Sequence, residues 1–170
     1  MYLEEMIIVL MNFEEVIIYE PDVYSDYRGH LWTLWKEDQF KPNLNFNHDK
    51  VSTSRKNVLR GIHGDFKSHK LVTCLCGELY FVLVDNRKDS STYMQWDYLM
   101  LDDNNKKQVL IPPGFGNGFL VMSSHAVFHY KWSYEGEYPD VNEQFTIKWN
   151  DERLNIDWPI VNPILQQRDK

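Results

Sequence analysis

The stretch from residue 71 to residue 84 most constrains how this chain can fold. It is rich in β-branched and aromatic residues and is apolar almost throughout, with a break only at Gly77-Glu78. Short continuous apolar runs on either side of a turn pair are typical of β-strands that are buried on both faces. We therefore expect two buried strands, residues 71–76 and 79–84, joined as a hairpin.

Further short strand candidates follow one another along the chain, at residues 15–19, 31–35, 51–54, 58–59, 94–101, 108–111, 118–122, 126–132 and 144–149. Turn signals such as Pro112-Pro113-Gly114 separate them, and residues 151–154 suit a short helix. Strands spaced by eight to twelve residues predict an all-β sandwich or barrel. A jelly roll (double-stranded β-helix) with short peripheral helices fits best, and it places a cavity between two sheets.

The length of 170 residues predicts one domain over residues 1–170. Residues 1–11 carry two acids before a short apolar run and lack a basic leader, so we expect an N-terminal extension or an added edge strand rather than a signal peptide or a membrane span. Cys74 and Cys76 are too close in sequence for an ordinary structural disulfide and have no second pair for a metal. These features predict a reduced, cytoplasmic protein.

The net charge is −7 and the isoelectric point is near 5.3. An acidic chain of this kind argues against binding to nucleic acid, which requires a basic face. It does not exclude an anionic small molecule, because a few local cations are enough to hold one.

One short motif carries chemistry. Arg60 and His63 are three residues apart, and Lys70 follows seven residues later. Histidine accepts protons near neutral pH, and two nearby cations suit an anionic substrate. The combination predicts proton abstraction from a carbon acid that carries an anionic group.

The same motif belongs to a series of blocks that resembles the dTDP-4-dehydrorhamnose 3,5-epimerase family. The blocks run in consistent order over about residues 16–169: residues 59–63, 70–72, 77–78, 111–120, 130–131 and 157–159, and Asp169. The resemblance implies a cupin-type jelly roll, usually a homodimer, that works without a cofactor on nucleotide-linked 4-keto-6-deoxy sugars.

The resemblance also implies roles for four residues. His63 is the expected base, Asp169 the carboxylate that orients it, and Lys70 the cation beside the developing enolate oxygen. Tyr130 is the expected acid that returns a proton to the opposite face. Phe128, Tyr130 and Trp132 alternate along one strand, so we expect Tyr130 to point into an aromatic cavity. Each of these residues alone would more often be structural, and only the combination favours catalysis.

The remaining expected site residues bind the substrate. Arg60 and Arg28 match positions that hold the pyrophosphate, for which arginine forks are suited. Tyr138 and Trp32 are expected to frame the nucleotide. The further expected contacts with the substrate are Lys50, Ser52, Gly64, Asp65 and Asn117.

The chain departs from the family pattern around the expected sugar pocket. Gly64-Asp65 stands in place of the usual Tyr-Gln, Asn117 replaces a common histidine, and His48 and Lys50 stand where glutamine and asparagine are typical. A glycine at position 64 would open volume for a larger sugar. We therefore expect a GDP-linked 4-keto-6-deoxy-heptose of bacterial capsule synthesis, with dTDP-4-keto-6-deoxyglucose as the alternative, and inversion at C3 alone or at both C3 and C5.

Two other functions remain open from the sequence: a ketoisomerase that moves the carbonyl between C3 and C4, and a non-catalytic sugar-binding module. Metal-binding jelly rolls usually supply a His-x-His pair and a later histidine. Here Asp65 follows His63 in that spacing, and Asn117 stands at the later position. We therefore predict no required metal.

Overall fold

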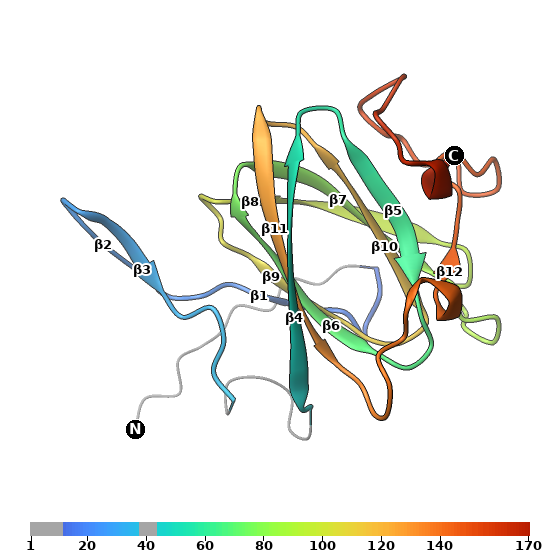
Figure 1. Ribbon diagram of the computed structural model, residues 1–170, viewed down its shortest axis with the longest axis horizontal. Helices are drawn as coiled ribbons and strands as arrows, with labels where there is room; N and C mark the ends of the chain where they lie inside the picture. The colour runs from blue at the N-terminus through green and yellow to red at the C-terminus, as the bar shows by residue number, and fades with distance from the viewer. Residues whose placement is uncertain (1–11, 38–43) are drawn as a thin grey trace.

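The computed structural model of the chain describes residues 12–37 and 44–170. Two five-stranded antiparallel sheets face each other (Figure 1). The first sheet has the order β1 (Ile17–Tyr19), β9 (Gln108–Ile111), β6 (His69–Cys76), β11 (His125–Ser133) and β4 (Phe46–Arg55). The second has the order β12 (Phe145–Thr146), β5 (Leu59–Gly64), β10 (Phe115–Val121), β7 (Glu78–Asp85) and β8 (Trp96–Asp102). The predicted all-β jelly-roll class is confirmed.

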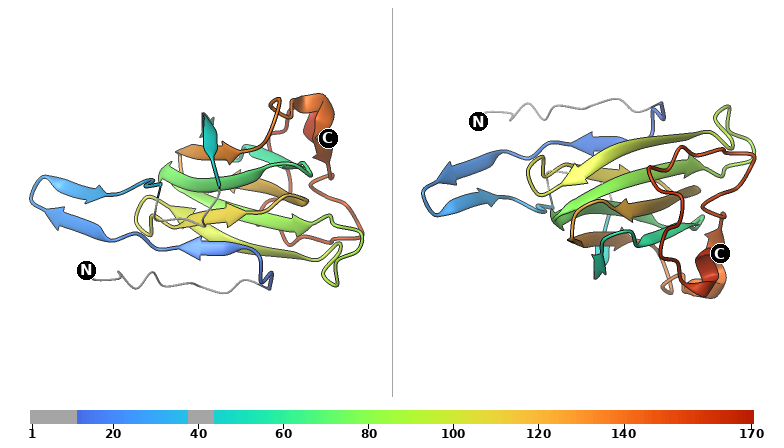
Figure 2. Two further views of the ribbon diagram at one scale, coloured as in Figure 1. Left: turned by 90° about the horizontal axis from the view of Figure 1, so that it is seen from below. Right: turned by 90° about the horizontal axis from the view of Figure 1, so that it is seen from above.

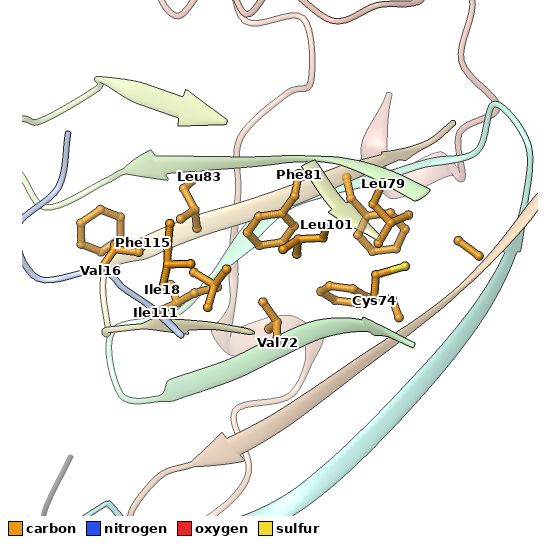
Figure 3. Close-up of a cluster of buried hydrophobic side chains, with 14 of the residues drawn as sticks. Val16, Ile18, Val72, Cys74, Leu79, Phe81, Leu83, Leu101, Ile111 and Phe115 are labelled. Carbon is orange, nitrogen blue, oxygen red and sulfur yellow. The ribbon is translucent and has the colours of Figure 1, made fainter. Parts of the chain in front are cut away.

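The main core lies between the two sheets (Figure 3). Alternate side chains of β6, such as Val72 and Cys74, point towards Leu79, Phe81 and Leu83 of β7, and all five are buried. Successive side chains of a strand point to opposite faces of the sheet, so every second residue of β6 enters this core. Burial of such side chains contributes roughly 1.5–3 kcal/mol each, so this layer fixes the distance between the sheets.

A second apolar cluster covers the outer face of the second sheet. Leu59 and Ile62 of β5 pack there with Leu154 and Trp158 of the C-terminal segment. The outer face of β5 is therefore buried, and the chain that follows β12 is held against it. This packing brings the C-terminus beside β5 (Figure 1).

The predicted hairpin of residues 71–76 and 79–84 is wrong in its pairing, although both strands exist. β6 pairs with β9 and β11, whereas β7 pairs with β10 and β8. Gly77 lies between them with φ +84°, a conformation that favours glycine, and there the chain crosses from one sheet to the other. Apolar residues on both faces indicate burial but do not indicate which strand is the partner.

The C-terminal third is less regular than predicted. Residues 151–154 form a single turn, in which the N–H groups of Leu154 and Asn155 donate to the carbonyl of Asp151, instead of a helix. The predicted strand at residues 144–149 is limited to β12. The helical elements of the described chain are two 3-10 turns, η1 (Val141–Glu143) and η2 (Gln167–Asp169).

A third, two-stranded sheet projects from the body as an arm (Figure 2). It consists of β2 (Val23–Asp26) and β3 (Gly29–Trp32). Two of its large side chains, Tyr24 and Leu31, are 67% and 72% exposed. Two strands alone rarely bury enough surface to be stable, so this arm leaves apolar side chains in contact with solvent.

Within residues 12–37 and 44–170, no helix is long and apolar enough to cross a membrane. The expected N-terminal extension, residues 1–11, lies outside the described residues.

Candidate functional site

A cavity of about 250 Å³ opens between the two sheets. Side chains from β4, β5, β6, β10 and β11 line it, together with η1 and the C-terminal segment. Eight of the residues expected in the site meet there: Lys50, Ser52, Arg60, His63, Lys70, Asn117, Tyr130 and Tyr138.

An irregularity in β5 brings Arg60 and His63 to the same cavity. On a regular strand, residues three apart face opposite sides. Here Asn117 pairs with His63 and Phe119 pairs with Arg60, so three steps along β5 oppose two steps along β10. Such a bulge re-aims side chains. The sequence motif alone did not reveal that it lies on a bulged strand.

His63 has a polar neighbour at each ring nitrogen. Nε2 lies 2.7 Å from Oδ1 of Asp169, whose side chain is fully buried, although the two atoms do not have the angles of a hydrogen bond. Nδ1 lies 3.1 Å from the hydroxyl oxygen of Thr146, its cross-strand neighbour on β12. A carboxylate at one ring nitrogen favours a proton there, so the other nitrogen keeps its lone pair to accept a proton. The pairing expected of Asp169 is therefore present.

Lys70 is buried in the wall of the cavity. Its Nζ lies 4.4 Å from the centroid of the Trp132 ring and 3.5 Å from Oδ2 of Asp65. Burial lowers the pKa of Lys70, Asp65 opposes this change, and Arg168 adds to it. The group is placed to stabilise a negative charge that develops within the cavity.

Tyr130 faces the cavity as the alternation of β11 predicts. Its ring lies between those of Phe128, at 5.4 Å, and Trp132, at 6.0 Å. Burial raises the pKa of Tyr130, while the nearby Lys50 and Arg60 oppose the change. The phenol therefore stays protonated and able to donate over a wide pH range.

Further cations line both walls of the cavity, Arg60 on β5 and Lys50 on β4. Nε of Arg60 donates to the hydroxyl of Ser54 at 2.9 Å, which leaves the rest of the guanidinium fork for an anion. Lys50 donates to the hydroxyl of Tyr138 and lies 4.0 Å from the centroid of that ring. The hydroxyl of Ser52 is buried without a hydrogen-bond partner among the described residues, so it is available to a ligand.

Some of the lining was missed by sequence reasoning. Gln144, Gln166 and Arg168 contribute to the cavity, and Nε of Arg168 donates to Thr146 at 3.2 Å. The closeness of Arg168 to Asp169 in sequence was the one signal available, because a segment that brings Asp169 to His63 also brings its neighbours.

Four expected contacts are not part of the cavity wall: Trp32, Gly64, Asp65 and Arg28. Trp32 lies at the end of β3, where Lys106 Nζ is 4.9 Å from its ring centroid. Arg28 lies on the arm and pairs with Asp26 at 2.6 Å. None of the four lines the cavity of its own chain, and their contact with the substrate stays a prediction.

The reason differs for Gly64. The residue is buried, and a Cβ at this position would overlap the carbonyl oxygen of Phe115 and the ring of Phe145. Phe145 also packs beside Gly116 and lies 5.2 Å from the ring of Phe66. The volume beside Gly64 is thus occupied by Phe145, and the expectation that this glycine enlarges the sugar pocket is wrong.

No three histidine, cysteine, aspartate or glutamate side chains group as a metal site would require in the part of the chain that the structure describes. The absence of a required metal stays a prediction.

Comparison with known proteins identifies the family. The family model described as dTDP-4-dehydrorhamnose 3,5-epimerase matches residues 11–170. The chain belongs to this family. A dTDP-4-dehydrorhamnose 3,5-epimerase of Salmonella typhimurium is 38% identical over 172 residues, which cover 96% of this chain and 92% of that protein. Membership of the family makes the chain an isomerase of the epimerase class.

Solved structures of family members agree with the fold. The dTDP-6-deoxy-D-glucose-3,5-epimerase of Legionella pneumophila, in complex with dTDP-4-keto-L-rhamnose, is 36% identical with a TM-score of 0.89, covering 96% of this chain and 89% of that one. A 3′-monoepimerase of Streptomyces bikiniensis, in complex with dTDP-quinovose, is 27% identical with a TM-score of 0.83, covering 94% and 83%. The same fold therefore includes both double and single epimerases.

Proposed function

We propose that this chain epimerises a dTDP-linked 4-keto-6-deoxy sugar, with His63 as the base that removes the proton. One observation carries the proposal. His63, backed by the buried Asp169, faces the same cavity as Lys70 and Tyr130. A sugar-binding module has no use for a base, a cation and an acid around one cavity.

The chemistry follows from the positions of these groups. A ketone at C4 acidifies the hydrogens on C3 and C5, but the carbanion still requires a base and a stabilised enolate oxygen. His63 takes the proton, and Lys70 faces the oxygen that becomes negative. Such general acid–base catalysis typically supplies about 10²–10⁴-fold.

Inversion requires a proton from the other side of the sugar ring. His63 lies on β5 of the second sheet, whereas Tyr130 lies on β11 of the first sheet. A sugar between the sheets therefore has the base on one face and the phenol on the other. This arrangement supports the assignment of Tyr130 as the acid.

The choice of nucleotide rests on two observations. The relatives are named for dTDP sugars, and the pocket enlargement expected at Gly64 is absent because Phe145 fills that volume. We therefore favour dTDP-4-keto-6-deoxyglucose over a GDP-linked heptose. Incubation in D₂O with dTDP- and GDP-linked 4-keto sugars tests this preference: faster deuterium uptake from the dTDP sugar is expected, and faster uptake from the GDP-heptose would reverse it.

The same experiment counts the positions that react. We propose reaction at both C3 and C5, so NMR of the product should show deuterium at both carbons. Deuterium at C3 alone would identify a monoepimerase. A carbonyl shifted to C3 with one new deuterium would instead identify a ketoisomerase, and no uptake from any substrate would favour a binding module.

We also propose that the working form is a homodimer in which the arm completes the site of the partner. Arg28 is exposed on this arm and outside the cavity of its own chain, while its family position is one that holds the pyrophosphate. Exposed Tyr24 and Leu31 on the same arm suit a protein surface. Sedimentation of the purified protein tests this: a dimer is expected, and a stable monomer with full activity would contradict it.

A further inference from the structure

Asp65 lies behind Lys70, and its two carboxylate oxygens have different surroundings. Oδ1 accepts the backbone N–H groups of Lys67, at 2.9 Å, and Ser68, at 2.6 Å. Oδ2 has no hydrogen-bond partner among the described residues and lies 3.5 Å from Nζ of Lys70. One oxygen therefore fixes the loop that leads into β6, and the other faces the ammonium group.

Lys70 requires such a partner. The residue is only 5% exposed, and Asp65 is only 2% exposed. A buried ammonium group loses most of its hydration, so without a counter-charge it becomes neutral. The ring of Trp132 offers its face to the ammonium but carries no net charge.

Other titratable groups around Lys70 do not supply that counter-charge. Arg168, from η2, is a cation and disfavours a second positive charge nearby. Asp140, the one carboxylate in the described wall of the cavity, caps η1 through the N–H of Val141 at 2.7 Å. None of the remaining titratable side chains in the wall is a carboxylate: Lys50, Arg60, His63, Tyr130 and Tyr138.

We propose that Asp65 is a positioning residue that keeps Lys70 protonated and holds its Nζ at the cavity wall before the substrate arrives. The inference rests on the proposed function, because that function places Lys70 at the enolate oxygen. Asp65 does not touch the substrate and acts through Lys70. An enolate then forms beside an ammonium group that is already charged and already in place.

Asp65→Asn tests the proposal, because asparagine retains an oxygen that can accept both backbone N–H groups and removes only the charge. Deuterium uptake into the 4-keto sugar should fall about tenfold or more at pH 9, since a close opposite charge typically changes protonation equilibria by that much or more. The loss should be smaller at pH 6.5, where Lys70 is protonated more readily.

Asp49→Asn is the matched control. Asp49 also pairs with a lysine, Lys131, at 2.6 Å. Because side chains alternate along β4, Asp49 points away from the cavity that its neighbour Lys50 lines. This variant should exchange at the wild-type rate at both pH values. Wild-type exchange by Asp65→Asn at both pH values would overturn the proposal.

A double-mutant cycle separates action through Lys70 from a purely structural effect. In a Lys70→Met background, Asp65→Asn should cause no further loss of exchange, and a further loss would overturn the proposal. In thermal unfolding, the double variant should be more stable than Lys70→Met alone, because that single variant leaves a buried carboxylate unpaired. A cycle without coupling would also overturn it.

The unfolding cycle does not depend on activity. If the wild-type protein exchanges no deuterium into any 4-keto sugar, the proposed function fails. The unfolding midpoints would still show whether Asp65 and Lys70 are coupled. Failure of the proposed function can therefore be distinguished from failure of the proposed role of Asp65.

Discussion

His63 owes its chemical character to residues that are distant from it in the sequence. Asp169 lies beside Nε2, and Thr146 lies beside Nδ1. An isolated imidazole samples both tautomers, whereas a ring held by a buried carboxylate keeps one. The proposed role of His63 as a base therefore depends on η2, the 3-10 turn that carries Asp169.

Asp169→Asn should lower the rate of deuterium uptake by roughly 100-fold, because the amide no longer stabilises the imidazolium that forms when His63 takes the proton. The KM for the 4-keto sugar should change much less. Steady-state kinetics on the variant would check both values. Asp151→Asn, which removes a carboxylate that pairs with Arg153 outside the cavity, is the control. A near-normal rate for Asp169→Asn would remove Asp169 from the mechanism.

Among the elements, β5 shows how a local irregularity makes a site. Its bulge turns Arg60 and His63 to one side, and Gly61 lies within it at φ +116°. A Cβ at Gly61 would overlap backbone atoms of Gly118 and Asn117 on β10. The close approach of the two strands therefore requires glycine at this position.

Gly61→Ala should cost about 3 kcal/mol of folding free energy, since it adds both backbone strain and a clash with β10. Gly136→Ala is the matched control. Gly136 also has a positive φ, +75°, but nothing lies within 4 Å of its Cβ position, so about 1 kcal/mol is expected. Chemical denaturation measures both. Equal losses would show that the contact with β10 is unimportant.

The loop after β7 depends on a buried ion pair. Nε and Nη2 of Arg87 donate hydrogen bonds to the carboxylate of Asp85, at 2.9 Å and 2.8 Å, and the hydroxyl of Thr92 donates to the same carboxylate. Burial alone would raise the pKa of Asp85, but hydrogen bonds from Arg87, Ser90 and Thr92 outweigh it and hold that pKa well below its usual range.

Asp85→Asn should therefore destabilise the protein by about 3 kcal/mol at pH 7, because it leaves Arg87 without its buried partner. A depressed folded-state pKa contributes stability above the unfolded value, about 4, and loses it as the pH falls towards the folded value. The difference in unfolding free energy between wild type and variant should therefore have its full value at pH 6 and decrease below pH 4. Denaturation curves at several pH values check this, and a gap that widened in acid would contradict it.

The strands could be predicted from sequence far better than their partners. Continuous apolar runs located β6 and β7, and turn residues bounded β9 and β11, within a few residues. Pairing could not be predicted, because strands buried on both faces, such as β6 and β7, are equally apolar towards any neighbour. The bulge in β5 was also invisible, since it depends on the register with β10.

At the scale of the whole molecule, the site is assembled from distant parts of the chain. His63, Lys70 and Tyr130 belong to motifs that the sequence displays, and they are among eight expected residues that line the cavity. Trp32, Gly64, Asp65 and Arg28 lie outside the cavity wall, because a motif does not say which face of a strand a residue occupies. Phe145 packs beside Gly64, and Arg28 lies on the exposed arm.

If the arm contributes to the site of the partner, two inactive variants should complement each other in a mixed dimer. Arg28→Ala inactivates the site that the arm enters, and His63→Asn inactivates the site of its own chain. A mixed dimer then holds one site with both Arg28 and His63 intact. The mixture, after co-expression, should be more active than either variant alone, whereas activity no greater than that of the separate variants would assign Arg28 no place in a partner site.

The central claim is that His63 removes a proton from carbon next to the C4 ketone. Deuterium uptake at C3 and C5 of dTDP-4-keto-6-deoxyglucose in D₂O, followed by NMR for the wild type and for His63→Asn, tests it most directly. Asparagine cannot accept the proton, so the account predicts uptake with the wild type and none above background with the variant, although the fold is retained. Near-normal uptake by His63→Asn would contradict it.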